Sequence, residues 1–336
     1  MIRILFLVCP LLLSAFEPQP VAQSPVIGFA KIPFTDPHLN MERELLVWYP
    51  VDPGAGKMPS RNPWDLFQIS DAPPANPAGK SVIVISHGYT SSPHQLSWLI
   101  RDLVANEFVV IGIQHLDRTG SVVQLNHWQR ARDISAMIDQ LGLSRFASAV
   151  NMDNIGIAGF SLGGTAAIWV SGGRSTQLDS VIPGPESVAN PEEFSPMEGG
   201  LASLDRKMMA KNWRDSRVKA AFVISPAWGW IFDPKSLHKI SVPTYIIAPA
   251  EDGLLITGAN AGFFAHHIPH SIFQIISGKA NHYVFIAPVD ADKRRQIDPS
   301  GHLSILFEDD SSVDRSWIQS RVSSEAARFF KSAFSK

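Results

Sequence analysis

Cysteine is almost absent from this sequence: Cys9 is the only one in 336 residues. It lies in an N-terminal segment with the features of an export signal, so the mature chain would hold no cysteine at all. Such a chain has no disulfide, no cysteine metal site and no thiol nucleophile. Its stability must then come from its core, which suits a large domain because a large domain buries a greater share of its surface.

The chain also has little charge and no excess of one sign. Lys and Arg number 29 against 31 Asp and Glu, and charged residues make up 18% of the sequence. The basic surplus of a nucleic-acid binder is missing, so we expect no nucleic-acid partner. With 45% hydrophobic residues, the composition predicts a sizeable core and excludes a disordered chain.

The N-terminal apolar run is too short for a membrane anchor. Residues 4–13 are apolar apart from an interruption at Cys9 and Pro10, and the run is roughly half of the about 20 residues that cross a bilayer. Arg3 precedes it, and cleavage sites with small residues follow near Ala15 and Ala22. These features predict an export signal over residues 1–22 and a secreted or periplasmic mature protein with no stable membrane insertion.

Short apolar runs recur along the rest of the chain and are typical of strands buried on both faces of a parallel sheet. They lie at residues 81–85, 108–113, 155–160, 220–224, 244–248 and 271–276. Helical periodicity separates them at residues 96–105 and 128–141, and a last helix is predicted over about 313–334. The alternation predicts an α/β fold with a mostly parallel central sheet and helices on both of its faces.

Three other segments do not follow this alternation. Residues 26–34 and 45–49 are predicted to be two strands joined by a polar turn, and residues 51–80 a long surface loop rich in Pro, Gly, Ala and Asn.

Residues 172–217 combine several prolines and glycines with methionines and a tryptophan. A structureless insertion of that length is uncommon in a compact domain unless it is functional. We therefore expect a cap over the site, with a peripheral decoration as the alternative.

The motif G-x-S-x-G occurs at residues 159–163, with Ser161 at its centre. A buried strand is predicted directly before it and a helix directly after it, which is the context of a nucleophile elbow. Such a turn holds the serine in a strained backbone position at the positive end of the helix. Ser161 is therefore the expected nucleophile.

A serine nucleophile needs a base that takes its proton. In this type of site the histidine comes last along the chain, after the acid. His282 follows the last predicted strand of the sheet, at the carboxyl edge where ligand sites lie. We expect His282 to be the base, with His302 as the alternative.

The acid that orients the histidine should follow an earlier strand. Asp252 comes after the predicted strand at residues 244–248, which leaves room for one helix and one strand before His282. We expect Asp252 to be the acid. Glu251, which is adjacent, and Asp233, after the preceding strand, are the other candidates.

Two backbone N–H groups should stabilise the oxyanion that forms during acyl transfer. The N–H of Leu162, directly after the nucleophile, is expected to be one. The loop after the strand at residues 81–85 is expected to provide the other at Tyr89, because Gly88 permits the required turn. Tyr89 would also bind the acyl group, and Trp228 is expected to bind substrate in an apolar cleft unless it packs in the core.

The remaining histidines do not predict a metal site. His266, His267 and His270 lie near a predicted helix end, and His115 lies close to Asp117. Neither group has a convincing set of ligands nearby in sequence. We therefore expect no metal and no cofactor.

The ordered motifs resemble those of the secreted dienelactone-hydrolase-like α/β hydrolases, a branch related to platelet-activating-factor acetylhydrolase. The resemblance covers about residues 26–330. It rests on residues 43–50, 86–88, 159–164, 225–227, 249–252, 260–261 and 281–283. It implies the α/β-hydrolase fold and a serine esterase with Ser161, Asp252 and His282 as its catalytic set.

Two departures from these families bear on the expected catalytic residues and substrate. Dienelactone hydrolases use a cysteine nucleophile, where this chain has Ser161, and animal acetylhydrolases place the acid where this chain has Pro226. The second departure favours Asp252 as the acid and argues against a phospholipid substrate. Residues 88–90 and 227–228 are also similar to bacterial cutinases and polyester hydrolases, which usually carry a disulfide that this chain cannot form.

The sequence thus predicts one α/β-hydrolase domain over residues 23–336, with a cap-like insertion at about 172–217. Its expected activity is the cleavage of carboxylic esters through an acyl-enzyme intermediate, with a small-molecule or lipid ester as substrate. The enzymatic alternatives are a short-chain acyl phospholipid and a cutinase-like polyester. The alternative from another class is a catalytically silent binding protein that uses the cap and the cleft.

Overall fold

The computed structural model describes most of the chain after the expected export signal. The described residues are 27–52, 60–62, 64, 66–75, 79–119, 122–123, 126–176, 205–301 and 303–335. The predicted export signal and the middle of the predicted cap, 177–204, lie outside them. None of the described helices combines the length and the apolar composition needed to cross a membrane.

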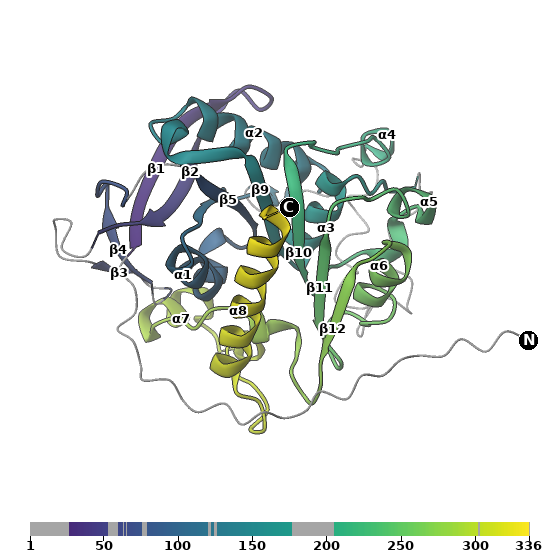
Figure 1. Cartoon of the computed structure of the whole chain (residues 1–336). Helices are drawn as coiled ribbons and strands as arrows, with labels where there is room; N and C mark the ends of the chain where they lie inside the picture. The colour runs from purple at the N-terminus through teal and green to yellow at the C-terminus, as the bar shows by residue number, and fades with distance from the viewer. Residues whose placement is uncertain are drawn as a thin grey trace, which may run out of the picture.

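The described strands form one ten-stranded sheet and a small two-stranded ribbon (Figure 1). From one edge to the other the sheet runs β12 (Ile272–Ile276), β11 (Thr244–Pro249), β10 (Val218–Ile224), β9 (Val150–Phe160), β5 (Lys80–Ser86), β6 (Val109–Gly112), β2 (Met41–Pro50), β1 (Ile27–Asp36), β4 (Phe67–Ser70) and β3 (Ser60–Arg61). Neighbouring strands are parallel from β12 to β6, and β2 is antiparallel to both β6 and β1. The ribbon pairs β7 (Arg118–Thr119) with β8 (Val122–Val123).

Helices cover both faces of the sheet because its central strands are apolar on both sides. In β5, Val82 and Val84 belong to one buried cluster, and Ile83 and Ile85 to the other, as expected from side chains that alternate along a strand. The first cluster includes residues of α2 (Gln129–Leu143), α3 (Leu162–Ser171) and α6 (Ala261–His267). The second includes residues of α1 (Ser97–Ala105) and α8 (Arg315–Phe334).

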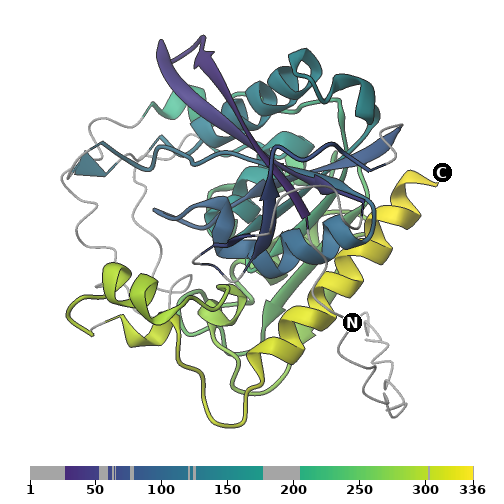
Figure 2. The same cartoon turned by 90° about the vertical axis from the view of Figure 1, so that its left-hand side faces the viewer.

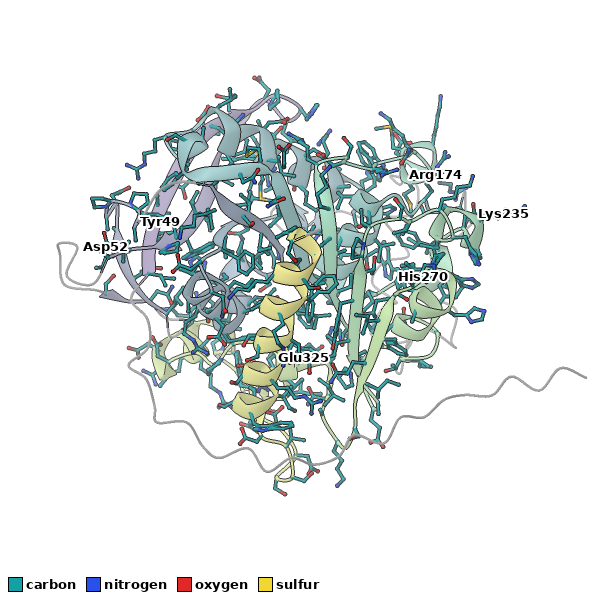
Figure 3. All side chains as sticks on the ribbon, viewed as in Figure 1. Tyr49, Asp52, Arg174, Lys235, His270 and Glu325 are labelled. Carbon is teal, nitrogen blue, oxygen red and sulfur yellow. The ribbon has the colours of Figure 1, made fainter. Side chains whose placement is uncertain are left out.

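The C-terminal helix α8 lies across the sheet, beside α1 (Figure 2). Glu325 of this helix, labelled in Figure 3, accepts a hydrogen bond from the hydroxyl of Tyr245 on β11. Ile318, Val322, Ala326 and Phe330 of this helix are buried against the sheet. Phe329 is half-buried, and its ring contacts those of Phe222 and Tyr245 on the sheet.

The prediction of a surface loop at residues 51–80 is wrong for part of its length. Strands β4 and β3 fall inside it, and β4 pairs with β1. Leu66 is buried there, and the Tyr49 hydroxyl donates a 2.7 Å hydrogen bond to the carbonyl of Ala72. Strands of two and four residues carry no periodic signal, and β4 forms by pairing with a strand about 40 residues away in sequence.

The strand predicted at residues 271–276 is also not buried on both faces. It is β12, at the edge of the sheet, where Ile272 and Ile275 are 52% and 51% exposed. Two short helices outside the expected cap were not predicted: α5 (Pro234–Leu237) and α7 (Ala291–Ile297). They span four and seven residues, too few to show a helical repeat. Helix α6 is the one expected between Asp252 and His282.

The cap expected at residues 172–217 stays a prediction, because only its two ends are described. The short helix α4 (Arg206–Met209) belongs to the second end. This end contacts the start of α2: the Asp205 N–H donates to the Asn126 side chain at 2.9 Å, and the Trp213 indole stacks on Trp128.

Truncation of Phe330 should test the packing of α8. We expect Phe330→Ala to lower the free energy of unfolding by about 3–5 kcal/mol, because it opens a cavity between α8 and the sheet. Trp317→Ala, on the same helix but at a side chain 57% exposed, should cost less than about 1 kcal/mol. Urea unfolding of both variants measures the difference, and equal losses would contradict this packing.

Candidate active site

Ser161 occupies a sharp turn between β9 and α3. Its backbone has φ 54° and ψ −121°, a region that non-glycine residues rarely adopt. The turn also requires glycine on both sides. A Cβ on Gly159 would lie 2.1 Å from the Gly163 carbonyl oxygen, and a Cβ on Gly163 would lie 1.9 Å from the Ser86 carbonyl oxygen. The structure therefore shows the tight strand–turn–helix geometry that a nucleophile elbow needs.

Asp252 and His282 meet at the same edge of the sheet. Asp252 follows β11, and His282 opens the 3-10 turn His282–Phe285 after β12. The His282 Nδ1 lies 2.9 Å from an Asp252 carboxylate oxygen, and both side chains are almost fully buried. The two backbones are also joined, because the His282 N–H donates to the Asp252 carbonyl at 2.5 Å. A proton on Nδ1, donated to the carboxylate, leaves Nε2 free to accept a proton.

The Asp252 carboxylate is itself held in place. Its second oxygen accepts the N–H groups of Leu255 at 2.7 Å and Leu254 at 3.2 Å. The His282 ring packs against the Phe160 ring, with centroids 4.9 Å apart. The imidazole is thus fixed in orientation by a hydrogen-bonded carboxylate on one edge and an aromatic ring beside it.

The other acid and base candidates do not join this arrangement. Asp233 caps α5, where its side chain accepts the Lys235 N–H at 3.1 Å. Glu251 is exposed. His302 lies outside the described residues. Among the described carboxylates, Asp252 is the one hydrogen-bonded to His282.

A cavity of about 970 Å³ brings the predicted site residues together. Ser161, His282, Tyr89, Leu162 and Trp228 all line it. Trp228 has a left-handed backbone with φ 62°, and its indole contacts the His127 ring at 5.0 Å between centroids. Trp228 is only 5% exposed, so it both packs in the core and forms part of the wall. A second cavity, of about 620 Å³, lies at the other end of α3, and neither Ser161 nor His282 lines it.

One wall of the larger cavity comes from residues that no motif in the sequence indicates. It comes from α7 and the turn Ser304–Leu306, a segment that follows His282 along the chain. Figure 2 shows this yellow-green segment projecting from the body of the sheet. Its lining residues are Lys293, Ile297, Leu303, Leu306 and Phe307. Lys293 is the only Lys or Arg among the described lining residues, and none of these residues is Asp or Glu.

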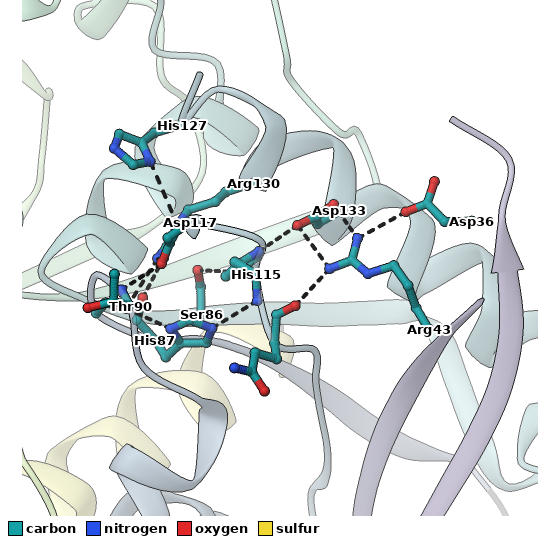
Figure 4. Close-up of polar contacts among 12 residues, drawn as sticks. Asp36, Arg43, Ser86, His87, Thr90, His115, Asp117, His127, Arg130 and Asp133 are labelled. Atoms are coloured by element: carbon teal, nitrogen blue, oxygen red, sulfur yellow. Dashed lines mark hydrogen bonds and ion pairs between the residues drawn. The ribbon is translucent and has the colours of Figure 1, made fainter. Parts of the chain in front are cut away.

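The structure also shows a buried polar cluster behind the loop that carries Tyr89 (Figure 4). Ser86 Oγ lies 3.0 Å from His115 Nε2, and His115 Nδ1 lies 2.7 Å from Asp133. These bonds follow the pattern of a nucleophile, a base and an acid. Ser86, however, is fully buried and does not line the cavity, and Asp133 is also paired with Arg43 at 2.7 Å. Ser86, His115 and Asp133 therefore do not face the cavity that Ser161 lines.

His115 and Asp117, which were expected to be ordinary residues, belong to this cluster. Burial lowers the pKa of His115, and the charge of Arg130 lowers it further. Burial likewise lowers the pKa of His127 to about 3. The imidazoles are thus neutral at physiological pH. Within the described part of the chain, no three His, Cys, Asp or Glu side chains are grouped so as to hold a metal ion.

Comparison with known proteins agrees with this geometry. The family model described as "PETase: PET hydrolase-like" matches residues 72–192, which include Tyr89 and Ser161. A ferulic acid esterase from Streptomyces cinnamoneus superposes with a TM-score of 0.60 at 17% identity, over 93% of this chain and 91% of that one. The chain has the α/β-hydrolase fold. No curated protein matches.

The structural match confirms the predicted fold. The α/β-hydrolase fold accounts for the position of Ser161 at the carboxyl end of a central strand. The family match supports an ester-cleaving serine hydrolase.

Two aspartate variants should identify the acid. We expect Asp252→Asn to lower kcat by about 10⁴, because the amide no longer stabilises a protonated His282. Asp233→Asn keeps a helix-capping side chain, so its kcat should stay within about twofold of wild type. Steady-state hydrolysis of p-nitrophenyl acetate by the two variants measures this. An inactive Asp233→Asn beside an active Asp252→Asn would move the acid to the preceding strand.

Proposed function

We propose that this α/β hydrolase cleaves carboxylic esters through an acyl-enzyme intermediate, with Ser161 as nucleophile, His282 as base and Asp252 as the orienting acid. The observation that supports this most directly is the 2.9 Å bond between His282 Nδ1 and Asp252, in a histidine that lines the same cavity as Ser161. The chemistry requires no metal and no cofactor, because the three side chains and two amides supply every group the reaction uses.

Each step of the reaction has a group to perform it. Ser161 Oγ attacks the carbonyl carbon of the ester while His282 Nε2 takes the hydroxyl proton. The N–H groups of Tyr89 and Leu162 bind the oxyanion of the tetrahedral intermediate. The intermediate collapses, the C–O bond breaks, and His282 returns the proton to the departing alcohol. A water, activated by His282 in the same way, then hydrolyses the acyl-enzyme and releases the acid.

The lining of the cavity supports an apolar ester that contains an aromatic or similarly flat group. Tyr89, Trp228 and Phe307 contribute aromatic side chains to a wall whose described residues include no carboxylate. Such rings bind flat apolar groups by stacking and by burying apolar area. The partner is thus a small-molecule or lipid ester.

A cutinase-like polyester is the second candidate, favoured by the match to the PET hydrolase-like family. A phospholipid is less well supported, since the acid beside His282 follows β11 and not the strand before it. The export signal expected at residues 1–22 would place the enzyme in the periplasm or outside the cell.

Removal of Ser161 should abolish the activity. We expect Ser161→Ala to lower kcat by about 10⁴–10⁶ with no change in melting temperature, because the nucleophile is lost while the fold remains. A fluorophosphonate probe should label the wild-type protein and leave Ser161→Ala unlabelled.

Ser86→Ala provides the matched control for labelling, because Ser86 also lies beside a histidine and an aspartate. This variant should still be labelled at Ser161. A wild-type protein that resists the probe would favour the silent binding protein. If the probe labels the protein, a panel of p-nitrophenyl esters from acetate to palmitate, an acetylated phospholipid and a polyester film would define the substrate.

A further inference from the structure

The loop that carries Tyr89 is held from behind by a buried arginine. Arg130, on α2, is 2% exposed and donates hydrogen bonds to two successive carbonyl groups of the loop. Its Nη1 binds the His87 carbonyl at 2.5 Å, and its Nη2 binds the Gly88 carbonyl at 3.1 Å. A guanidinium is suited to this task because its donors form a rigid planar fork.

The position of the Gly88 carbonyl decides where the next amide points. In a trans peptide the C=O of one residue and the N–H of the next point in opposite directions, and the described chain has no cis peptide. The Tyr89 N–H therefore points away from Arg130. Gly88 and Tyr89 line the cavity together with Ser161, whereas Arg130 does not. This orientation is the one that an oxyanion-binding amide needs.

A second bond to the Gly88 carbonyl comes from His87. The His115 N–H donates to His87 Nε2 at 3.0 Å, so Nε2 is an acceptor and the ring proton resides on Nδ1. That Nδ1 lies 2.6 Å from the Gly88 carbonyl and donates to it. Burial lowers the pKa of His87 well below its ordinary value, so the ring stays neutral. The carbonyl is thus held by two donors.

Asp117 binds both Arg130 and the backbone of Thr90, the residue that follows Tyr89. Its two carboxylate oxygens accept Arg130 Nε at 3.0 Å and Nη2 at 2.6 Å, a bidentate pair. One of them also accepts the Thr90 N–H at 2.7 Å. Thr90 has a positive φ of 49°, a conformation that needs support from its surroundings. Figure 4 shows Asp117 between Arg130 and Thr90.

We propose that Arg130 is a positioning residue for ester hydrolysis: by binding the carbonyls of His87 and Gly88, it keeps the Tyr89 N–H aimed at the oxyanion. This role rests on the proposed function. It differs from a purely structural one, in which Arg130 only neutralises the buried Asp117. A structural role predicts a loss of stability alone, whereas positioning predicts a loss of transition-state binding in the protein that remains folded.

Arg130→Gln and Arg130→Lys test the proposal. Glutamine removes the charge and the fork; lysine keeps the charge beside Asp117 but has one nitrogen, which cannot reproduce all the bonds. Loss of an oxyanion donor lowers kcat by about 10²–10³. We expect misalignment to lower kcat by about 10- to 100-fold in Arg130→Gln, and less in Arg130→Lys. KM should change by less than about threefold, because the oxyanion forms only in the transition state.

The decisive readout is inhibition by phenylboronic acid, which forms a tetrahedral adduct with the nucleophilic serine. Its Ki should rise roughly in proportion to the fall in kcat/KM, since the adduct uses the same amide. Rates are divided by the active-site concentration from fluorophosphonate titration, so that unfolded protein does not count. If Arg130→Gln does not fold, Arg130→Lys carries the same comparison.

Arg217→Gln is the matched control. Arg217 makes a two-point contact with Asp215, at 2.9 and 2.7 Å, and also binds α2 through the Ser135 carbonyl. This variant should lose stability but keep the kcat and Ki of wild type.

The two proposals fail in different ways. A wild-type protein that neither hydrolyses esters nor reacts with the probe would overturn the esterase function itself. The positioning role would be overturned, and the esterase function left intact, by either of two results. In one, the Arg130 variants have the wild-type kcat, calculated per active site, and the wild-type Ki. In the other, they have a raised KM with an unchanged kcat.

Discussion

The candidate site depends on the close approach of two backbones, at Gly163 in α3 and at Ser86 in β5. Any side chain at position 163 would overlap the Ser86 carbonyl oxygen. This contact places the first turn of α3 directly against the end of β5, from which the loop with Tyr89 continues. Because β5 and β9 are paired side by side, with Ser86 opposite Gly159, Ser161, Leu162 and the loop with Tyr89 lie at the same edge of the sheet and line one cavity.

Behind this point the protein buries five charged side chains. The carboxylates of Asp36, Asp117 and Asp133 and the guanidinium groups of Arg43 and Arg130 are all nearly inaccessible. Burying ions is expensive unless they are paired and fully hydrogen-bonded. Here Arg43 joins Asp36 to Asp133, and Arg130 joins Asp117 to the loop. These ion pairs therefore link the antiparallel strands, α2 and the loop that carries Tyr89. The site keeps its shape only if these elements keep their relative positions.

The cavity in front of Ser161 is built from segments with different degrees of support. The central strands, α3 and Trp228 form a rigid floor in the buried clusters. The wall from α7 and the following turn rests on fewer buried side chains, since α7 itself has none and Leu303 and Ile305 are 42% and 54% exposed. The core thus supports the pair of Asp252 and His282, while the wall from α7 and the following turn lies nearer the surface, where loops vary most easily.

The sequence by itself determined the alternating fold, the elbow at Ser161 and the order of serine, aspartate and histidine. Each of these follows from residues that are close together in the sequence: apolar runs indicate buried strands, and two glycines around a serine indicate a tight turn. Only the tertiary structure decided the rest. It placed Asp252, and not Asp233, against His282; it paired β4 with β1 inside an expected loop; and it joined Arg43 to Asp133, 90 residues apart, beneath the site. These features depend on which groups, distant in the sequence, meet when the chain folds. A hydrogen bond between side chains far apart in the chain produces no periodic pattern in the sequence.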